Sequence, residues 1–202
     1  MKKTIFLLLI LLSFYSQAQK NLARVYKING IDVYILNEPL REYETVYGKG
    51  TGLNFGSYLT GGLINKSVSG KVSKFVKGVL KKAKKEGKDI DAIIYSGGKN
   101  VIAVKYTDES TKDTDGIARV QRVNGIPMYA MCEPLKDFRT VATKGGGIKW
   151  KSAVTAGVLN NSIEEDLAKF AKKFKKYYNK RKIDALLYTG GKSCDGIKFK
   201  EK

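Results

Sequence analysis

The sequence predicts an α+β protein with two tandem homologous domains, each a small, mainly antiparallel sheet with one long amphipathic helix packed on one face. Three observations support this. The chain repeats itself, each repeat passes from strand patterns into a helical pattern, and each ends in short apolar segments joined at Gly-Gly. We place the first domain (repeat 1) at residues 19–106, a linker at 107–117, and the second domain (repeat 2) at 118–202.

Residues 1–18 have the pattern of a signal peptide and precede the fold. Lys2 and Lys3 form a short positive region, residues 5–15 are apolar, and residues 16–18 supply small side chains for a cleavage site. The apolar run is shorter than the roughly 20 residues of a membrane-spanning helix. We expect cleavage after Ala18 and export to the periplasm, the outer membrane or the extracellular medium. No later stretch has the length and apolar character of a transmembrane segment.

The repetition is collinear through both repeats. Ile28–Val46 reads INGIDVYILNEPLREYETV, and Val123–Val141, 95 residues later, reads VNGIPMYAMCEPLKDFRTV. Beyond the helices the offset falls to 93, where DAIIYSGGK at 91–99 corresponds to DALLYTGGK at 184–192. This order indicates a tandem duplication. Two such domains can also pack on each other as an intramolecular pseudo-dimer.

The first half of each repeat has strand character. Asn29-Gly30 and Asn124-Gly125 lie between alternating apolar segments, which is typical of a tight hairpin turn. Glu-Pro is expected to turn the chain, because a residue before proline avoids the helical region. The expected strands lie at 31–36 and 43–48 in repeat 1 and at 126–131 and 138–143 in repeat 2.

The second half of each repeat predicts one helix and two strands. From residue 68 to 83, apolar residues recur every three or four positions and lysines fill the other face, and residues 163–178 repeat the pattern after a capping-box start at Ser162. Strands are expected at 92–95, 101–106, 185–188 and 196–199. The predicted core consists of Val33, Ile35, Val46, Phe75, Val79, Ile93, Ile94 and Val104 with their counterparts in repeat 2.

These motifs resemble those of a family of small exported α/β domains. The resemblance rests on VNGIPMY, EPL, DF and TV within residues 123–141, on the basic amphipathic helix, and on DALLYTGG followed by IKF. The pattern is similar to that of the heavy-metal-binding (YbjQ-like) domain and of the Rcs outer-membrane sensor lipoprotein, once in each repeat. The resemblance implies a strand–helix–strand–strand core in each repeat. The functions that it implies are metal binding or stress sensing.

The chain contains no histidine, which excludes a Ser-His-Asp triad, a Cys-His pair and an imidazole metal site. Gly190–Ser193 (GGKS) lacks the earlier glycine of a phosphate-binding loop and precedes a strand. Glu38 and Glu133 are either acid–base carboxylates or structural residues of a turn, and their equivalent places on separate domains favour the turn. We predict a non-enzymatic protein with no catalytic residue, metal site or cofactor.

Cys132 and Cys194 are the two cysteines of the chain, and both lie in repeat 2, where repeat 1 has Asn37 and Val101. Two cysteines together in one domain of an exported chain suggest a disulfide bond. Each lies at the end of a predicted strand, where neighbouring strands can bring them together. The alternative is two free thiols, which have no histidine to activate them.

The glycine-rich loops are the strongest candidates for a binding site. Residues 48–62 carry Phe55, and residues 143–157 carry Trp150 among Lys144, Lys149 and Lys151. An aromatic ring with neighbouring cations suits sugars, nucleobases or lipid headgroups. The alternative is that the aromatic side chain covers the core and glycine only allows the loop to close.

The charge of the chain favours acidic partners. There are 38 Lys and Arg against 19 Asp and Glu, a net charge of +19, which becomes +17 without the two lysines of the leader. We predict an exported envelope protein that acts as a protein-interaction or accessory module. The alternative is a polyanion-binding protein that uses its lysine-rich helices and the Lys-Trp loop on lipopolysaccharide, anionic lipid or nucleic acid. The expected partner is an envelope protein or an anionic envelope polymer or lipid.

Overall fold

The protein is mostly β, and the predicted fold class is wrong. The computed structural model describes residues 19–48, 68–97, 100–107, 114–145, 163–191 and 193–201. Within these residues, 49% lie in strands and 26% in helices, with two α-helices and two sheets. The prediction of an α+β protein with two tandem domains, each with its own sheet and helix, fails because strands of one repeat pair with strands of the other.

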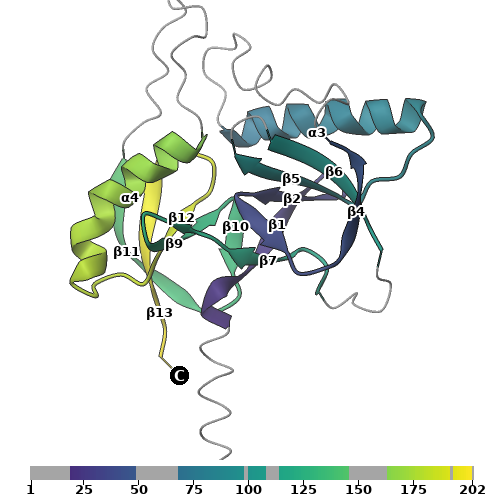
Figure 1. Ribbon diagram of the computed structural model, residues 1–202. Coiled ribbons are helices and arrows are strands. Elements are labelled where there is room, and N and C mark those ends of the chain that lie inside the picture. Colours follow the sequence, from purple (N-terminus) through teal and green to yellow (C-terminus); the bar gives the residue numbers. More distant parts are fainter. Residues whose placement is uncertain are drawn as a thin grey trace, which may run out of the picture.

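The helices and strands predicted from local patterns are confirmed close to their expected places, and Figure 1 labels most of them. The first half of the chain contains η1 (Gln19–Asn21), β1 (Leu22–Ile28), β2 (Ile31–Ile35), β3 (Asn37–Pro39), β4 (Tyr43–Tyr47), α3 (Val68–Lys85), β5 (Ala92–Gly97) and β6 (Asn100–Tyr106). The second half contains β7 (Ile117–Val120), β8 (Arg122–Val123), β9 (Ile126–Ala130), β10 (Cys132–Pro134), β11 (Phe138–Gly145), α4 (Ile163–Asn179), β12 (Ala185–Tyr188) and β13 (Ser193–Phe199).

Each repeat arranges its strands in the same order. The order is β4-β6-β5-β2-β1 in repeat 1 and β11-β13-β12-β9-β8 in repeat 2. β2 runs parallel to β5, and β9 runs parallel to β12. Parallel neighbours need a crossover connection, and the helix supplies it in each repeat. Figure 1 shows α3 and α4 each lying over one of these strand arrangements.

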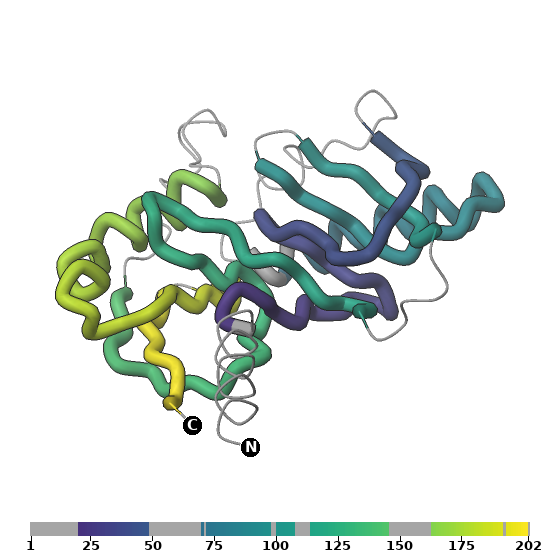
Figure 2. Tube along the Cα trace, turned by 60° about the horizontal axis from the view of Figure 1, so that its bottom comes forward, coloured from purple at the N-terminus to yellow at the C-terminus, as the bar shows by residue number. Residues whose placement is uncertain are grey.

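The two repeats exchange strands at the centre of the molecule. β1 pairs antiparallel with β7, and Ala23 lies opposite Ala118, which is the equivalent residue of the other repeat. β10 pairs with β1, and β3 pairs with β7, so a short strand from each repeat joins the first strand of the other. Figures 1 and 2 show this central layer between the two helix-covered parts of the molecule. It extends the sheet of repeat 1 to eight strands, while the second sheet has five.

The Glu-Pro pairs do not turn the chain as predicted but lie in the exchanged strands. Glu38 in β3 lies opposite Arg119, and Glu133 in β10 lies opposite Arg24. Proline is tolerated because β3 and β10 each pair with a single strand, as edge strands do. Each short strand follows a residue with a positive φ angle, which is 53° at Leu36 and 51° at Met131.

Two hydrophobic clusters hold the fold, and most of the predicted core is confirmed. The larger cluster lies on the helix side of the sheets and the smaller one includes the central strands. The predicted residues of repeat 1 that are buried are Val33, Ile35, Phe75, Val79, Ile93, Ile94 and Val104. 

Val46 and Val141 are the exceptions to the predicted core, since Val46 is only half-buried and Val141 is 41% exposed. Both lie where the strand register shifts, between Thr45 and Tyr47 in β4 and between the equivalent residues of β11. A bulge of this kind interrupts the alternation of inward and outward side chains. In repeat 1 the inward place therefore passes to Tyr47, which is 1% exposed.

Candidate functional site

Most of the predicted Lys-Trp loop site lies outside the described residues. Phe55, Lys149, Trp150 and Lys151 all fall there. Lys144 is described and lies in β11, with its Nζ atom 5.0 Å from the ring centroid of Tyr177 in α4. The Lys-Trp loop site therefore stays a prediction.

Cys132 and Cys194 do not form the predicted disulfide bond, because both are free and buried thiols. They belong to different hydrophobic clusters, Cys132 to the central one and Cys194 to the one on the helix side. The prediction placed both cysteines at strand ends of one domain. It did not foresee that β10, which carries Cys132, pairs with β1 of the other repeat.

The environment of both thiols keeps them protonated. Burial raises the pKa of Cys132 to about 12, although the side-chain amide of Asn37 donates to its Sγ atom at 3.4 Å and acts in the opposite direction. Burial also raises the pKa of Cys194 to about 12, and the nearby Asp195 adds to the rise. Since the thiolate is the reactive form, neither cysteine is a nucleophile at neutral pH.

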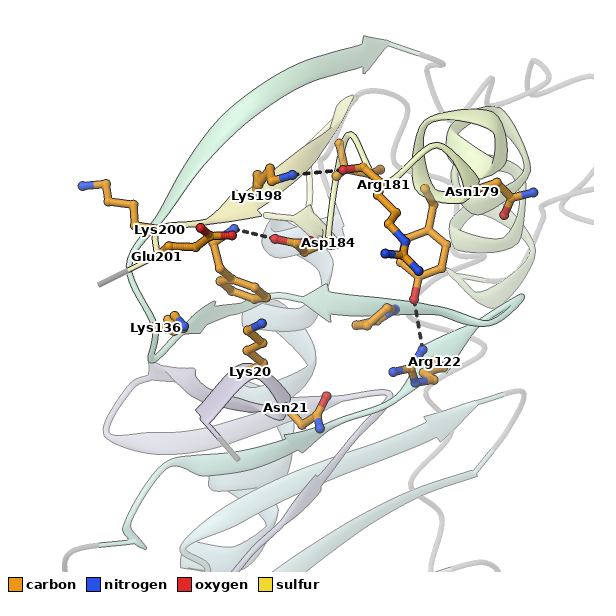
Figure 3. Close-up of a pocket in the computed structure, with 14 residues that line it drawn as sticks. Lys20, Asn21, Arg122, Lys136, Asn179, Arg181, Asp184, Lys198, Lys200 and Glu201 are labelled. Carbon is orange, nitrogen blue, oxygen red and sulfur yellow. Dashed lines mark hydrogen bonds between the residues drawn. The ribbon is translucent and has the colours of Figure 1, made fainter. Parts of the chain in front are cut away.

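A cavity of about 630 Å³ on repeat 2 brings many charged side chains together. It lies between η1, the β8–β9 hairpin, the end of α4 and the end of β13, as Figure 3 shows. In the part of the chain that the structure describes, six basic side chains line it: Lys20, Arg122, Lys136, Arg181, Lys198 and Lys200. Two acidic side chains of the same part, Asp184 and Glu201, also line it. We call this the basic cavity.

Hydrogen bonds hold two of these cations at the wall without neutralising them. The guanidinium of Arg122 donates from its Nη1 atom to the carbonyl oxygen of Gly125 at 3.0 Å and to the hydroxyl of Tyr178 at 3.2 Å. The Nζ atom of Lys198 donates to the carbonyl oxygen of Arg181 at 3.0 Å, and Figure 3 marks this bond and the bond from Arg122 to the hydroxyl of Tyr178. The acceptors are neutral, so both positive charges are retained.

One of the two carboxylates has a structural role. Oδ2 of Asp184 accepts a hydrogen bond from the backbone N–H of Phe199 at 2.9 Å. Asp91 of repeat 1 does the same for the backbone N–H of Tyr106 at 2.8 Å. This bond fastens the last strand in each repeat, so Asp184 serves the fold as well as lining the basic cavity.

Lys20 is positioned at the edge of the basic cavity by its backbone. Its carbonyl oxygen accepts a hydrogen bond of 2.5 Å from the hydroxyl of Tyr129 in β9. Burial raises the pKa of Tyr129, which keeps this hydroxyl protonated as a donor. This bond involves only the backbone of Lys20, whose side chain is among those that line the cavity.

The equivalent region of repeat 1 contains a hydrogen-bonded network. Tyr106 donates from its hydroxyl to Oδ2 of Asp32 at 3.0 Å, and its oxygen lies 2.9 Å from that of Tyr34. Arg41 pairs with Asp115, and its guanidinium carbon lies 4.3 Å from the ring centroid of Tyr106. Burial raises the pKa of Tyr34 to about 12 and raises that of Tyr106 as well. Both tyrosines therefore remain hydrogen-bond donors rather than bases.

The basic cavity was not identified from the sequence. Its lysines and arginines are spread from residue 20 to residue 200, and no local motif connects them. A comparison of charge between the repeats would have revealed it. Lys20 stands at the position of Asp115, and Pro127 stands at the position of Asp32.

Neither a cluster of possible metal ligands nor a comparison with known proteins indicates a function for the site. Among the described residues, no group of three or more His, Cys, Asp or Glu side chains could hold a metal ion. In the same part of the chain, no helix combines the length and apolar character needed to cross a membrane. No family model matches the chain, and no curated protein or solved structure is similar to it. The resemblance to the heavy-metal-binding domain family remains a prediction.

Proposed function

We propose that this protein is a non-enzymatic binding protein that takes anionic ligands into the basic cavity. The charge imbalance of that cavity carries the proposal, since among the described residues six cationic side chains and two carboxylates line a space of about 630 Å³. A cavity of this size is within the range of about 300–1,000 Å³ that is usual for ligand pockets. The neutral acceptors of Arg122 and Lys198 position these charges but leave them available to a ligand.

The physical reason is electrostatic. Cations that gather around one cavity repel one another, and an anion between them replaces repulsion by attraction. At a separation of 4 Å, the attraction of two unit charges is about 1 kcal/mol in bulk water and about 4 kcal/mol at the effective dielectric constant of a protein surface. Several such contacts are enough for specific binding, and salt screens them.

The expected setting is the cell envelope, where the protein would act as an interaction or accessory module. The signal-peptide pattern of residues 1–18 supports export, and cleavage after Ala18 would leave a new α-ammonium group on Gln19, next to Lys20. A net charge of +17 would attract acidic proteins, polymers and lipids. The exchange of strands between equivalent positions supports the view that the chain is an intramolecular pseudo-dimer.

Titration with inorganic polyphosphate tests the basic cavity directly. We expect binding that weakens steadily as the salt concentration rises. The double variant Arg122→Gln/Lys198→Gln should bind at least about tenfold more weakly, because about 1.4 kcal/mol of lost attraction is a factor of ten. The matched control is Lys77→Gln/Lys81→Gln, which removes the same charge from the exposed face of α3.

A second candidate function follows from the helices themselves. α3 exposes Lys74, Lys77, Lys81, Lys84 and Lys85, which form a basic surface on the side away from the core. Such a surface suits a polyanion that lies along the helix rather than in a cavity. If the control variant loses polyphosphate binding and the cavity variant retains it, the helix surface is the site and the cavity proposal is wrong.

A further inference from the structure

The basic cavity of repeat 2 occupies the place that the network around Asp32 occupies in repeat 1. The strand order around both places is the same, with β2 beside β5 and β9 beside β12. The last strand of each repeat is fastened by the same bond, to Asp91 at 2.8 Å in one and to Asp184 at 2.9 Å in the other. Residues at equivalent positions can therefore be compared one by one.

In repeat 1, three cations are each matched by an acid of the same chain. The ion pairs are Lys27–Asp32 at 3.5 Å, Arg41–Asp115, and Lys105–Asp89 at 3.7 Å. The side chains of Asp32 and Arg41 are only 3% and 8% exposed, so two of these pairs are partly shielded from water. Shielding strengthens the attraction and makes an unmatched charge costly.

In repeat 2, the three cations are kept and all three acids are replaced. The cations at the positions of Lys27, Arg41 and Lys105 are Arg122, Lys136 and Lys198. The acids at the positions of Asp32 and Asp115 are replaced by Pro127 and Lys20. The acid at the position of Asp89 is replaced by Lys182. At these aligned positions repeat 2 thus has the basic residue of each pair but not the acidic residue.

Repeat 1 also shows which chemistry fits the missing half. Asp115 is carried by the polypeptide segment that enters β7, and the next residue, Gly116, packs closely on Asp32. A Cβ atom on Gly116 would lie 3.3 Å from Oδ1 of Asp32, and its φ angle of +67° also favours glycine. Repeat 1 is therefore closed by a side-chain carboxylate on a segment of polypeptide chain.

We infer that the basic cavity receives an acidic polypeptide segment of a partner protein, whose side-chain carboxylates contact Arg122 and Lys198 as Asp115 contacts Arg41. This inference rests on the proposed function, since it names the ligand class of the same cavity. The carboxylates of the partner replace the acids that repeat 2 has lost. The protein then belongs among the interaction modules, and its basic charge brings acidic protein segments to the cavity.

A peptide with the sequence of residues 107–116, TDESTKDTDG, is the appropriate probe, because it contains the carboxylate that closes repeat 1. Labelled with fluorescein, it can be titrated by fluorescence anisotropy alongside inorganic polyphosphate and vesicles of phosphatidylglycerol. We expect the peptide to bind, and Arg122→Gln/Lys198→Gln to weaken it at least about tenfold. The control Lys77→Gln/Lys81→Gln should change its affinity less than about twofold, as expected for charges outside the site.

A second variant introduces into repeat 2 two of the acids that repeat 1 has at the equivalent positions. Lys20→Asp/Lys182→Asp should close the basic cavity with internal ion pairs and weaken peptide binding at least about tenfold, without lowering the melting temperature. Lys20→Ala/Lys182→Ala removes the same two lysines but supplies no acid, so it should weaken binding less. Equal loss in the two variants would mean that the lysines act only through their own charge, and the correspondence with repeat 1 would be wrong.

The remaining outcomes separate the inference from the proposed function. If polyphosphate or vesicles bind through Arg122 and Lys198 but the peptide does not, the acidic-polypeptide inference is overturned and anion binding stands. If neither the peptide nor any other anion binds, both fail. If the peptide binds equally well to every variant, its site lies elsewhere and the inference is overturned.

Discussion

Repeat 1 and repeat 2 have the same strand order but differ in the acidic residues that accompany their equivalent cations. Repeat 1 pairs Lys27 and Arg41 with its own acids, and Tyr106 contacts both Asp32 and Arg41. Repeat 2 keeps the cations and leaves a cavity of about 630 Å³. Two similar halves of one chain thus differ in whether the cations at equivalent positions have acids of the same half beside them.

The largest effects on the free energy of unfolding are expected from residues of the hydrophobic core that differ between the two repeats. In repeat 1, Val79 and Ala103 belong to the same hydrophobic cluster, and repeat 2 has Phe174 and Gly196 at the equivalent positions. A Cβ atom on Gly196 would lie only 2.8 Å from Cε1 of Phe174 and 3.0 Å from Cγ2 of Ile183. The larger ring in repeat 2 therefore requires the smaller residue opposite it.

We expect Phe174→Val to lower the free energy of unfolding by about 2–4 kcal/mol, because it leaves a cavity. Gly196→Ala should lower it by about 1–3 kcal/mol through overpacking. The double variant has the pair found in repeat 1, so it should be more stable than the sum of the two losses predicts, by more than about 0.5 kcal/mol. Urea unfolding of the four proteins measures this, and additive losses would contradict the exchange of volumes.

A smaller effect is expected from the ion pair that closes repeat 1. Asp115→Asn should lower the free energy of unfolding by about 1–2 kcal/mol, because it leaves the charge of Arg41 without its carboxylate. The value is reduced because the Asp115 side chain is 42% exposed, which allows water to screen the pair.

Repeat 2 offers the matched control for that pair. Lys20 stands at the position of Asp115, and Lys20→Ala should change the stability by less than about 0.5 kcal/mol or raise it slightly. Thermal unfolding of both variants at low salt makes the comparison. A similar loss in the two proteins would mean that residues 20 and 115 support the fold in the same way, and the contrast between the closed and open regions would not hold.

The sequence was sufficient for the elements that depend on neighbouring residues. The hairpin at Asn29-Gly30, the amphipathic α3 and most of the core follow from local patterns, because turn preference and burial act over short spans. The fold class was not predictable in this way. Pairing of β10 with β1 joins residues more than 100 positions apart, and nothing in the sequence of either strand specifies its partner.

The basic cavity, like the strand pairing, could not be predicted from local sequence patterns. The cations of the basic cavity come from η1, β8, the turn between β10 and β11, the segment after α4, and β13 with the residue after it, so only the tertiary fold brings them together. The sequence did contain the relevant information as a difference between the repeats, at Lys20 against Asp115 and at Pro127 against Asp32. That difference acquires meaning only once the network in repeat 1 is known.

The smallest expected effect concerns alkaline pH and again separates the repeats. Burial raises the pKa of the Cys132 and Cys194 thiols in repeat 2 from the ordinary value of 9.0 to about 12. Their counterparts in repeat 1, Asn37 and Val101, do not titrate. Between about pH 9 and about pH 12 the unfolded state releases these protons while the folded state retains them. The stability contributed by the protonated thiols is therefore fully present below about pH 9 and is lost as the pH rises toward about 12.

The variant Cys194→Val introduces the residue of repeat 1 and removes one of these titrations. We expect the melting temperature of the natural protein to fall more steeply between about pH 8 and about pH 11 than that of the variant, because only the natural protein must keep this thiol protonated. Tyr34, whose pKa burial raises to about 12, contributes to both curves and so cancels in the difference. Parallel curves would show that the burial of Cys194 places no alkaline limit on repeat 2.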